Sequence, residues 1–251
     1  MIDFFETVPT DTVPILFLHG LGASRWMCWQ QQAAFSDTPL ILVDLPGHGK
    51  SINTPWQSFA DTADMIAGEV IQNRAVHVVG LSLGGHVALE LAKRYPKMVQ
   101  SLFISGITVR PMHFGFLLKL QSRIVQRGIR NGPYLEKIAR EHYHLPPGKI
   151  SEFIANYQLL TSKTYETIWK EIIRFRLDGS YGHIDQPCLF AAGDQESRGI
   201  MEATKIAPEI LPNAVGKLIP GAQHDWPVQQ PAQFNRLLRE WLDFHKGGMD
   251  S

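Results

Sequence analysis

A serine flanked by glycines stands between a predicted strand and a predicted helix. The motif Gly-Leu-Ser-Leu-Gly at residues 80–84 follows the apolar residues 76–79 and leads into the helical pattern of residues 86–96. A serine in such a turn adopts a strained conformation that pushes its hydroxyl outward, and the glycines leave room for the crossing backbone. We therefore interpret Ser82 as a candidate nucleophile, with a serine helix cap in a glycine-rich turn as the alternative. The N–H of Leu83, at the start of the helix, is a candidate donor to an oxyanion.

A serine hydroxyl becomes a strong nucleophile only when a base removes its proton, and that base must be held by a carboxylate. His224 follows the last apolar run of the chain, and Asp194 follows the run before it. Asp225 is an alternative acid, but a direct neighbour in sequence rarely curls back to the histidine ring. We predict His224 as the general base and Asp194 as the acid that orients it. No histidine and carboxylate pair has metal-ligand spacing, so we expect no metal and no cofactor.

The elements that must position these residues are short apolar runs separated by helical patterns. Each run ends in small or turn-forming residues, and the runs span residues 13–20, 39–47, 75–82, 99–106, 186–194 and 214–222. Near-continuous Val, Ile, Leu and Phe is typical of strands buried on both faces, and helices between them are typical of parallel crossovers. The sequence predicts an α/β fold with a mostly parallel sheet. The candidate residues then lie at the carboxyl ends of strands, where such sheets bind ligands.

A long helical stretch interrupts this alternation and predicts a cap. Residues 109–183 form the predicted cap, while residues 1–108 and 184–251 form the core of one continuous globular unit. The cap carries twelve basic and six acidic residues, which leaves it at about +6 and the rest of the chain at about −6. A solvated helix face accounts for this split, and a docking surface for an acidic partner is the alternative.

The overall composition excludes several classes of partner. Twenty-four basic residues balance twenty-four acidic ones, so the whole chain has no long-range attraction for nucleic acid or an anionic membrane. The start has no signal-peptide pattern and no apolar run reaches the roughly 18 residues of a membrane span, so we expect a cytoplasmic protein. Cys28 and Cys188 lie in apolar contexts and are expected to be buried thiols.

The sequence Asp-Leu-Pro-Gly-His-Gly-Lys-Ser at residues 44–51 superficially matches a phosphate-binding loop. That loop requires glycine where Asp44 stands, and Pro46 removes an amide that would otherwise face a phosphate. We therefore do not expect nucleotide binding.

Five motifs together resemble the α/β-hydrolase superfamily over nearly the whole chain. In order they are HGLG, DLPGHGKS, GLSLGG, AAGD and GAQH. The resemblance implies cleavage of an ester, thioester or amide through an acyl-enzyme on Ser82. It also implies that the N–H of Leu21, after His-Gly, joins that of Leu83 in the oxyanion hole, while His19 braces the loop. Serine at the nucleophile position departs from the haloalkane dehalogenases and soluble epoxide hydrolases, which use aspartate.

Within the superfamily, the length and the basic cap most resemble the pimeloyl-carrier-protein methyl ester esterase group. That resemblance implies a small or carrier-bound acyl ester as substrate, an acidic acyl carrier protein as partner, and a substrate-facing cap helix that contains Phe153 and Tyr157. Two alternatives use the same residues differently. One is a lyase or C–C hydrolase of the menaquinone-pathway type, and the other is a ligand-sensing receptor of the strigolactone and karrikin type.

Overall fold

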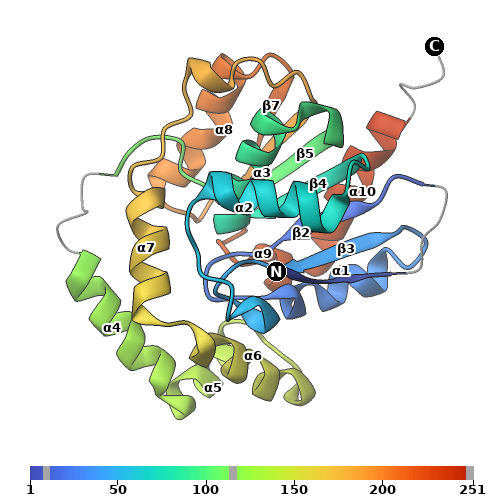
Figure 1. The fold of residues 1–251 in the computed structure, drawn as a ribbon. Coiled ribbons are helices and arrows are strands. Elements are labelled where there is room, and N and C mark those ends of the chain that lie inside the picture. Colours follow the sequence, from blue (N-terminus) through green and yellow to red (C-terminus); the bar gives the residue numbers. More distant parts are fainter. Residues whose placement is uncertain (8–11, 113–117, 247–251) are drawn as a thin grey trace.

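The computed structural model describes residues 1–7, 12–112 and 118–246, and within them a seven-stranded sheet forms the centre of the molecule (Figure 1). The strand order is β1-β3-β2-β4-β5-β6-β7, and all neighbours pair in parallel except β1 with β3. The strands are β1 (Asp3–Glu6), β2 (Ile15–Leu18), β3 (Leu40–Asp44), β4 (Val76–Leu81), β5 (Val99–Ser105), β6 (Cys188–Gly193) and β7 (Ala214–Ile219). This arrangement confirms the predicted fold class.

Helices cover both faces of the sheet (Figure 1). Those of the described residues are α1 (Trp29–Ala34), α2 (Phe59–Met65), α3 (Leu83–Arg94), α4 (Leu118–Arg130), α5 (Gly132–Glu141), α6 (Pro147–Leu159), α7 (Ser162–Ile172), α8 (Arg198–Ile210), α9 (Trp226–Gln229) and α10 (Pro231–Lys246). Leu16 and Leu18 of β2 pack into a core shared with α2, α3 and α8. Ile15 and Phe17, on the opposite face, join a second core with α9 and α10. Because both faces are buried, β2 is apolar at every position.

The six apolar runs of the sequence correspond to β2 through β7. The sheet also contains β1, which pairs antiparallel with β3 and is only partly buried. β7 lies at the other edge, where Val215 and Leu218 are exposed. Cys28 and Cys188 are buried free thiols. None of the helices in the described ranges combines the length and the apolarity that a membrane span requires.

Helices α4 to α7 follow β5 in the chain and gather as a group beside the sheet (Figure 1). Two of them begin at residues that cap the free backbone N–H groups of a first turn: Asn131 accepts from the N–H of Tyr134, and Thr161 accepts from that of Thr164. α7 is held to the core by Glu171, whose carboxylate accepts hydrogen bonds from the Trp56 indole and the Phe59 backbone.

Candidate active site

Ser82 occupies the sharp junction between β4 and α3. Its backbone has φ 51° and ψ −113°, a combination that costs energy for a residue with a side chain. Two hydrogen bonds hold this conformation, one from the Ser82 N–H to the Ser105 carbonyl at 2.8 Å and one from the Gly85 N–H to the Ser82 carbonyl at 2.9 Å. The predicted tight turn is thus present, and its strain is held by the neighbouring strand β5.

The glycines around Ser82 are required by close packing of the backbone. A Cβ on Gly80 would lie 2.6 Å from the Gly84 carbonyl oxygen, and one on Gly84 would lie 2.1 Å from the carbonyl oxygen of Leu18. Both contacts are with backbone atoms of the sheet or of the turn itself, which cannot move aside without disturbing the junction.

Gly84→Ala should therefore lower the free energy of unfolding by about 3 kcal/mol, at the upper end of the range for overpacked sites. The measurement is urea denaturation followed by circular dichroism. Gly132→Ala is the matched control, because among the described residues no atom beyond the local backbone lies within 4 Å of the added Cβ, and it should change the free energy by no more than about 0.5 kcal/mol. An equal effect of both changes would contradict the packing argument.

His224 lies on the loop after β7, and its surroundings fix the position of its ring. A Cβ on Gly106, which has φ +74°, would lie 2.8 Å from Cε1 of His224, so glycine permits this close approach. The next residue but one, Trp226, is fully buried and donates its indole N–H to Oγ of Ser105 at 2.9 Å. The loop is therefore anchored to the same strand, β5, that holds the turn of Ser82.

The carboxylate that contacts His224 is Glu196 and not Asp194. Nδ1 of His224 lies 2.6 Å from Oε2 of Glu196, whose side chain is 1% exposed. The other oxygen of Glu196 accepts the Gly193 N–H at 2.9 Å, which fixes the carboxylate. Asp194 instead accepts the N–H of Gly221 at 2.9 Å. The predicted pairing of Asp194 with His224 is thus corrected. The shorter side chain of Asp194, at the end of β6, binds the loop after β7 through Gly221. The longer side chain of Glu196, two residues further on, reaches the ring of His224.

Electrostatic interactions shift the pKa of His224 upward. Burial by itself would lower that pKa, but the hydrogen bond to Glu196 and the charges of Asp225 and Glu196 outweigh it. Asp225, the alternative acid in the sequence, contacts a different histidine: its Oδ2 is 3.2 Å from Nε2 of His142 at the end of α5.

His19 supports the loop that contains Leu21. The Leu45 N–H donates to its Nε2 at 2.9 Å, so Nδ1 must carry the proton and donate to the Gly20 carbonyl at 2.8 Å. Burial lowers the pKa of His19 to about 4, which keeps the ring neutral. This is the bracing position expected for His19.

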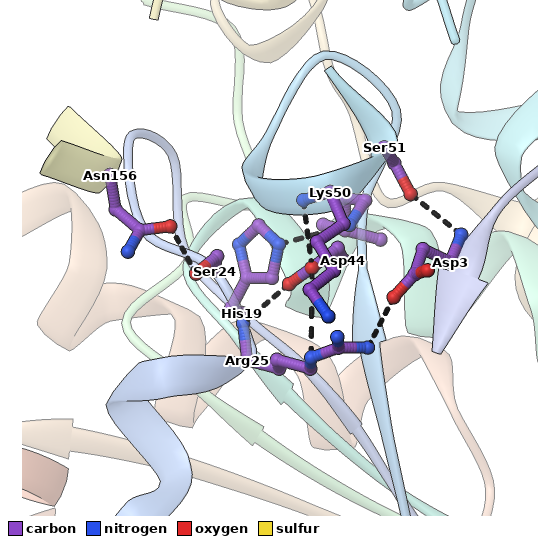
Figure 2. Close-up of polar contacts among 9 residues, drawn as sticks. Asp3, His19, Ser24, Arg25, Asp44, Lys50, Ser51 and Asn156 are labelled. Carbon is purple, nitrogen blue, oxygen red and sulfur yellow. Dashed lines mark hydrogen bonds and ion pairs between the residues drawn. The ribbon is translucent and has the colours of Figure 1, made fainter. Parts of the chain in front are cut away.

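Asp44 extends this support through a polar network (Figure 2). Its two oxygens accept the backbone N–H groups of Arg25 and Lys50 at 2.8 and 3.0 Å. The Arg25 guanidinium pairs in turn with Asp3 of β1. The same loop reaches α6, because Oγ of Ser24 donates to Oδ1 of Asn156 at 2.7 Å. One backbone amide of the turn at residues 44–51, that of Lys50, is therefore hydrogen-bonded to a carboxylate of the protein itself.

Ser82 and His224 both line two cavities, which lie under α4 to α7. The first, called here the polar pocket, has a volume of about 60 Å³ and is lined by Gly20, Leu21, Ala23, Trp26, Met27, Leu81, Ser82, Ser105, Tyr143, Tyr157, His224, Asp225, Pro227 and Val228. The second, called the apolar cleft, has a volume of about 400 Å³ and is lined by Leu21, Gly22, Ser82, Ile124, Val125, Gly128, Ile129, Tyr134, Leu135, Ile138, Tyr157, Leu160, Tyr165, Trp169 and His224.

The residues expected to face the substrate differ in position. Leu21 and Tyr157 line both cavities. Leu83 is buried as the first residue of α3. Phe153 is buried behind Tyr157 and Trp26, with ring centroids 4.5 and 5.6 Å away, and lines a separate hollow. Tyr143, which the sequence did not single out, has a place in the polar pocket because the end of α5 folds against the loop of His224.

Comparison with known proteins identifies the family. The model of the alpha/beta hydrolase family matches residues 15–237. An AB hydrolase superfamily protein of Gibberella zeae is 35% identical over 251 residues, covering 95% of this chain and 83% of the relative. A pimeloyl-[acyl-carrier protein] methyl ester esterase of Neisseria meningitidis is 35% identical over 106 residues, which cover 42% of this chain and 40% of that protein. The solved structure of a thermophilic esterase from Thermogutta terrifontis has the same fold, with a TM-score of 0.75 at 22% identity over 97% of this chain and 93% of that one. The chain belongs to the alpha/beta hydrolase family.

Proposed function

We propose that this protein is a serine esterase that cleaves carboxylic esters through an acyl-enzyme. The observation that carries the proposal is the shared cavity of Ser82, in its strained turn, and His224, whose Nδ1 is bonded to the buried Glu196. Since Nδ1 faces the carboxylate, Nε2 is the nitrogen free to serve the serine. The esterases among the relatives and structural neighbours support the same reaction.

In the proposed cycle, Oγ of Ser82 attacks the ester carbonyl carbon while its proton passes to Nε2 of His224. The resulting oxyanion accepts hydrogen bonds from the N–H groups of Leu21 and Leu83. As the carbon–oxygen bond to the alcohol breaks, His224 returns the proton to the leaving oxygen. A water molecule then loses a proton to His224 and attacks the acyl carbon; the bond from that carbon to Oγ of Ser82 breaks, His224 returns the proton to Oγ, and the carboxylic acid leaves. Glu196 holds the ring and stabilises its protonated form.

The test of this function is hydrolysis of short p-nitrophenyl esters by the purified chain. An initial burst of p-nitrophenol equal to the enzyme concentration is expected wherever deacylation is slower than acylation. A fluorophosphonate should add once per chain, as read by intact mass, and should block turnover in parallel. An inactive chain that is not labelled would count against an esterase.

We also propose that the basic surface of α4 receives an acidic acyl carrier protein. A groove of about 600 Å³ on this helix is lined by Arg123, Arg127 and Arg130, with exposed Leu120 and Ile124. Within the described part of the chain none of these three arginines has an ion-pair partner. Ile124 also lines the apolar cleft, so the groove adjoins a path to Ser82. The partial identity with the pimeloyl-[acyl-carrier protein] methyl ester esterase supports this partner.

Reversing the three arginines together to glutamate should lower kcat/KM for a carrier-bound ester by about tenfold at low ionic strength. A small free ester should be cleaved as before, and the difference should fade as salt is added, because screening weakens charge-driven encounter. The control is reversal of the exposed Lys97, Lys205 and Lys217, which changes the net charge by the same amount away from α4. Equal losses in the two triple variants would show that net charge, and not this groove, governs the encounter.

A further inference from the structure

The two cavities beside Ser82 differ in size and chemistry. The apolar cleft is bounded by aliphatic side chains of α4 and α5 together with Leu160 and Trp169. The polar pocket is much smaller, and at about 10–15 Å³ for each water-sized group its 60 Å³ holds about five. Tyr157 lines both, so it stands between them. An ester bound at Ser82 therefore has one roomy apolar side and one side limited to a few atoms.

Three polar groups meet in the polar pocket. The hydroxyls of Tyr143 and Tyr157 lie 3.2 Å apart. Burial raises the pKa of Tyr143 well above its ordinary value, and the neighbouring Tyr157 and Asp225 raise it further. The pKa of Tyr157 is raised by burial and by Asp225. Both phenols are therefore neutral, and each carries one proton to donate.

Counting these protons shows what the pocket can still bind. Either phenol can donate to the other, so the contact between Tyr143 and Tyr157 uses one of their two protons. From outside the pocket, Nε2 of His142 contacts Oδ2 of Asp225. The other phenol proton remains to donate, and lone pairs on the phenols and on Asp225 remain to accept. The pocket can thus both donate and accept hydrogen bonds, as a hydroxyl also does, and the carboxylate in its wall disfavours an anion.

We propose that the polar pocket binds the alcohol part of the substrate and selects an alcohol with a second hydroxyl close to the ester oxygen. The inference rests on the proposed esterase function. The alcohol side is assigned because the leaving oxygen takes its proton from His224, and the polar pocket is the cavity bounded by the loop of His224, Asp225, Pro227 and Val228. The acyl chain then occupies the apolar cleft.

The experiment compares kcat/KM for the 2-hydroxyethyl, 2-methoxyethyl and propyl esters of one acid, hexanoic acid. The hydroxyethyl ester should be preferred over both others by about tenfold, the value of one net hydrogen bond. Equal rates for hydroxyethyl and methoxyethyl esters would overturn the inference while leaving the esterase intact. Failure to cleave any of the three, together with p-nitrophenyl esters, would instead count against the proposed function itself.

Two substitutions test whether Tyr143 and Asp225 recognise the second hydroxyl of the alcohol. Tyr143→Phe removes one of the two phenol hydroxyls of the pocket, and Asp225→Asn replaces an acceptor oxygen with an amide that also donates. Each should bring the hydroxyethyl to methoxyethyl ratio down toward one, whatever it does to the absolute rate. Tyr95→Phe is the matched control, because it removes a tyrosine–aspartate hydrogen bond, 2.7 Å to Asp64, outside the site. A ratio that stays at the wild-type value in both pocket variants would show that this network does not select the alcohol.

Discussion

Ser82→Ala should remove turnover of p-nitrophenyl esters almost completely, by a factor on the order of 10⁶ in kcat, the loss found when a serine nucleophile of this kind is deleted. The reason is that no neighbouring group can form the acyl bond from the same position. Labelling by the fluorophosphonate should disappear as well. Alanine and serine both carry a Cβ and are equally strained in this turn, so the midpoint of thermal unfolding should stay close to that of the wild type.

Ser105→Ala is the matched control, because Ser105 is another serine in the polar pocket. Its hydroxyl already accepts the Trp226 indole at 2.9 Å. This variant should still add one fluorophosphonate, even if the loosened loop of His224 slows turnover. Retained labelling in Ser82→Ala, with loss in Ser105→Ala, would move the nucleophile to Ser105 and overturn the assignment of Ser82.

The sequence predicted the central sheet well because its strands have two buried faces. Ile15 and Phe17 face one core and Leu16 and Leu18 the other, so the whole run is apolar and is visible without any partner. β1 was missed for the opposite reason. Asp3–Glu6 is a short edge strand, only partly buried, and what makes it a strand is its antiparallel pairing with β3, which local sequence does not contain.

The candidate nucleophile and base could be predicted because each is marked by its immediate neighbours. Ser82 is surrounded by glycines that the packing requires, and His224 lies on the loop after the last strand. The acid depends on contacts between loops. Asp194 and Glu196 both follow β6, and the choice between them is made by the Gly221 N–H, which binds Asp194, and by the turn that brings Glu196 back to Gly193. The sequence signal for the acid was that two carboxylates, and not one, follow the same strand.

The cavity walls were the least predictable part of the site. Phe153 and Tyr157 are one helical turn apart on α6, yet Tyr157 lines both cavities and Phe153 packs behind it. Tyr143 enters through a loop contact, where the Gln229 amide donates to the His142 carbonyl at 2.9 Å. Such positions follow from how α5 and α6 pack on the core, and a pattern along one segment does not contain that information.

Glu196→Gln should lower kcat by a factor on the order of 10³–10⁴, as loss of the orienting carboxylate does in serine proteases, because the amide can present an N–H to Nδ1 and favour the wrong tautomer of His224. A second effect separates this role from a structural one. His224 must be neutral to accept a proton, so kcat/KM falls as pH drops through its pKa. That pKa is raised above its ordinary value of about 6.5 partly by Glu196. The acid limb of the wild-type profile should therefore lie above that value, and Glu196→Gln should move it to lower pH.

Asp194→Asn is the matched control, because its amide oxygen still accepts the Gly221 N–H and His224 keeps its partner. That variant should retain both the rate and the position of the limb, whereas a larger loss in Asp194→Asn than in Glu196→Gln would reinstate Asp194 as the orienting acid.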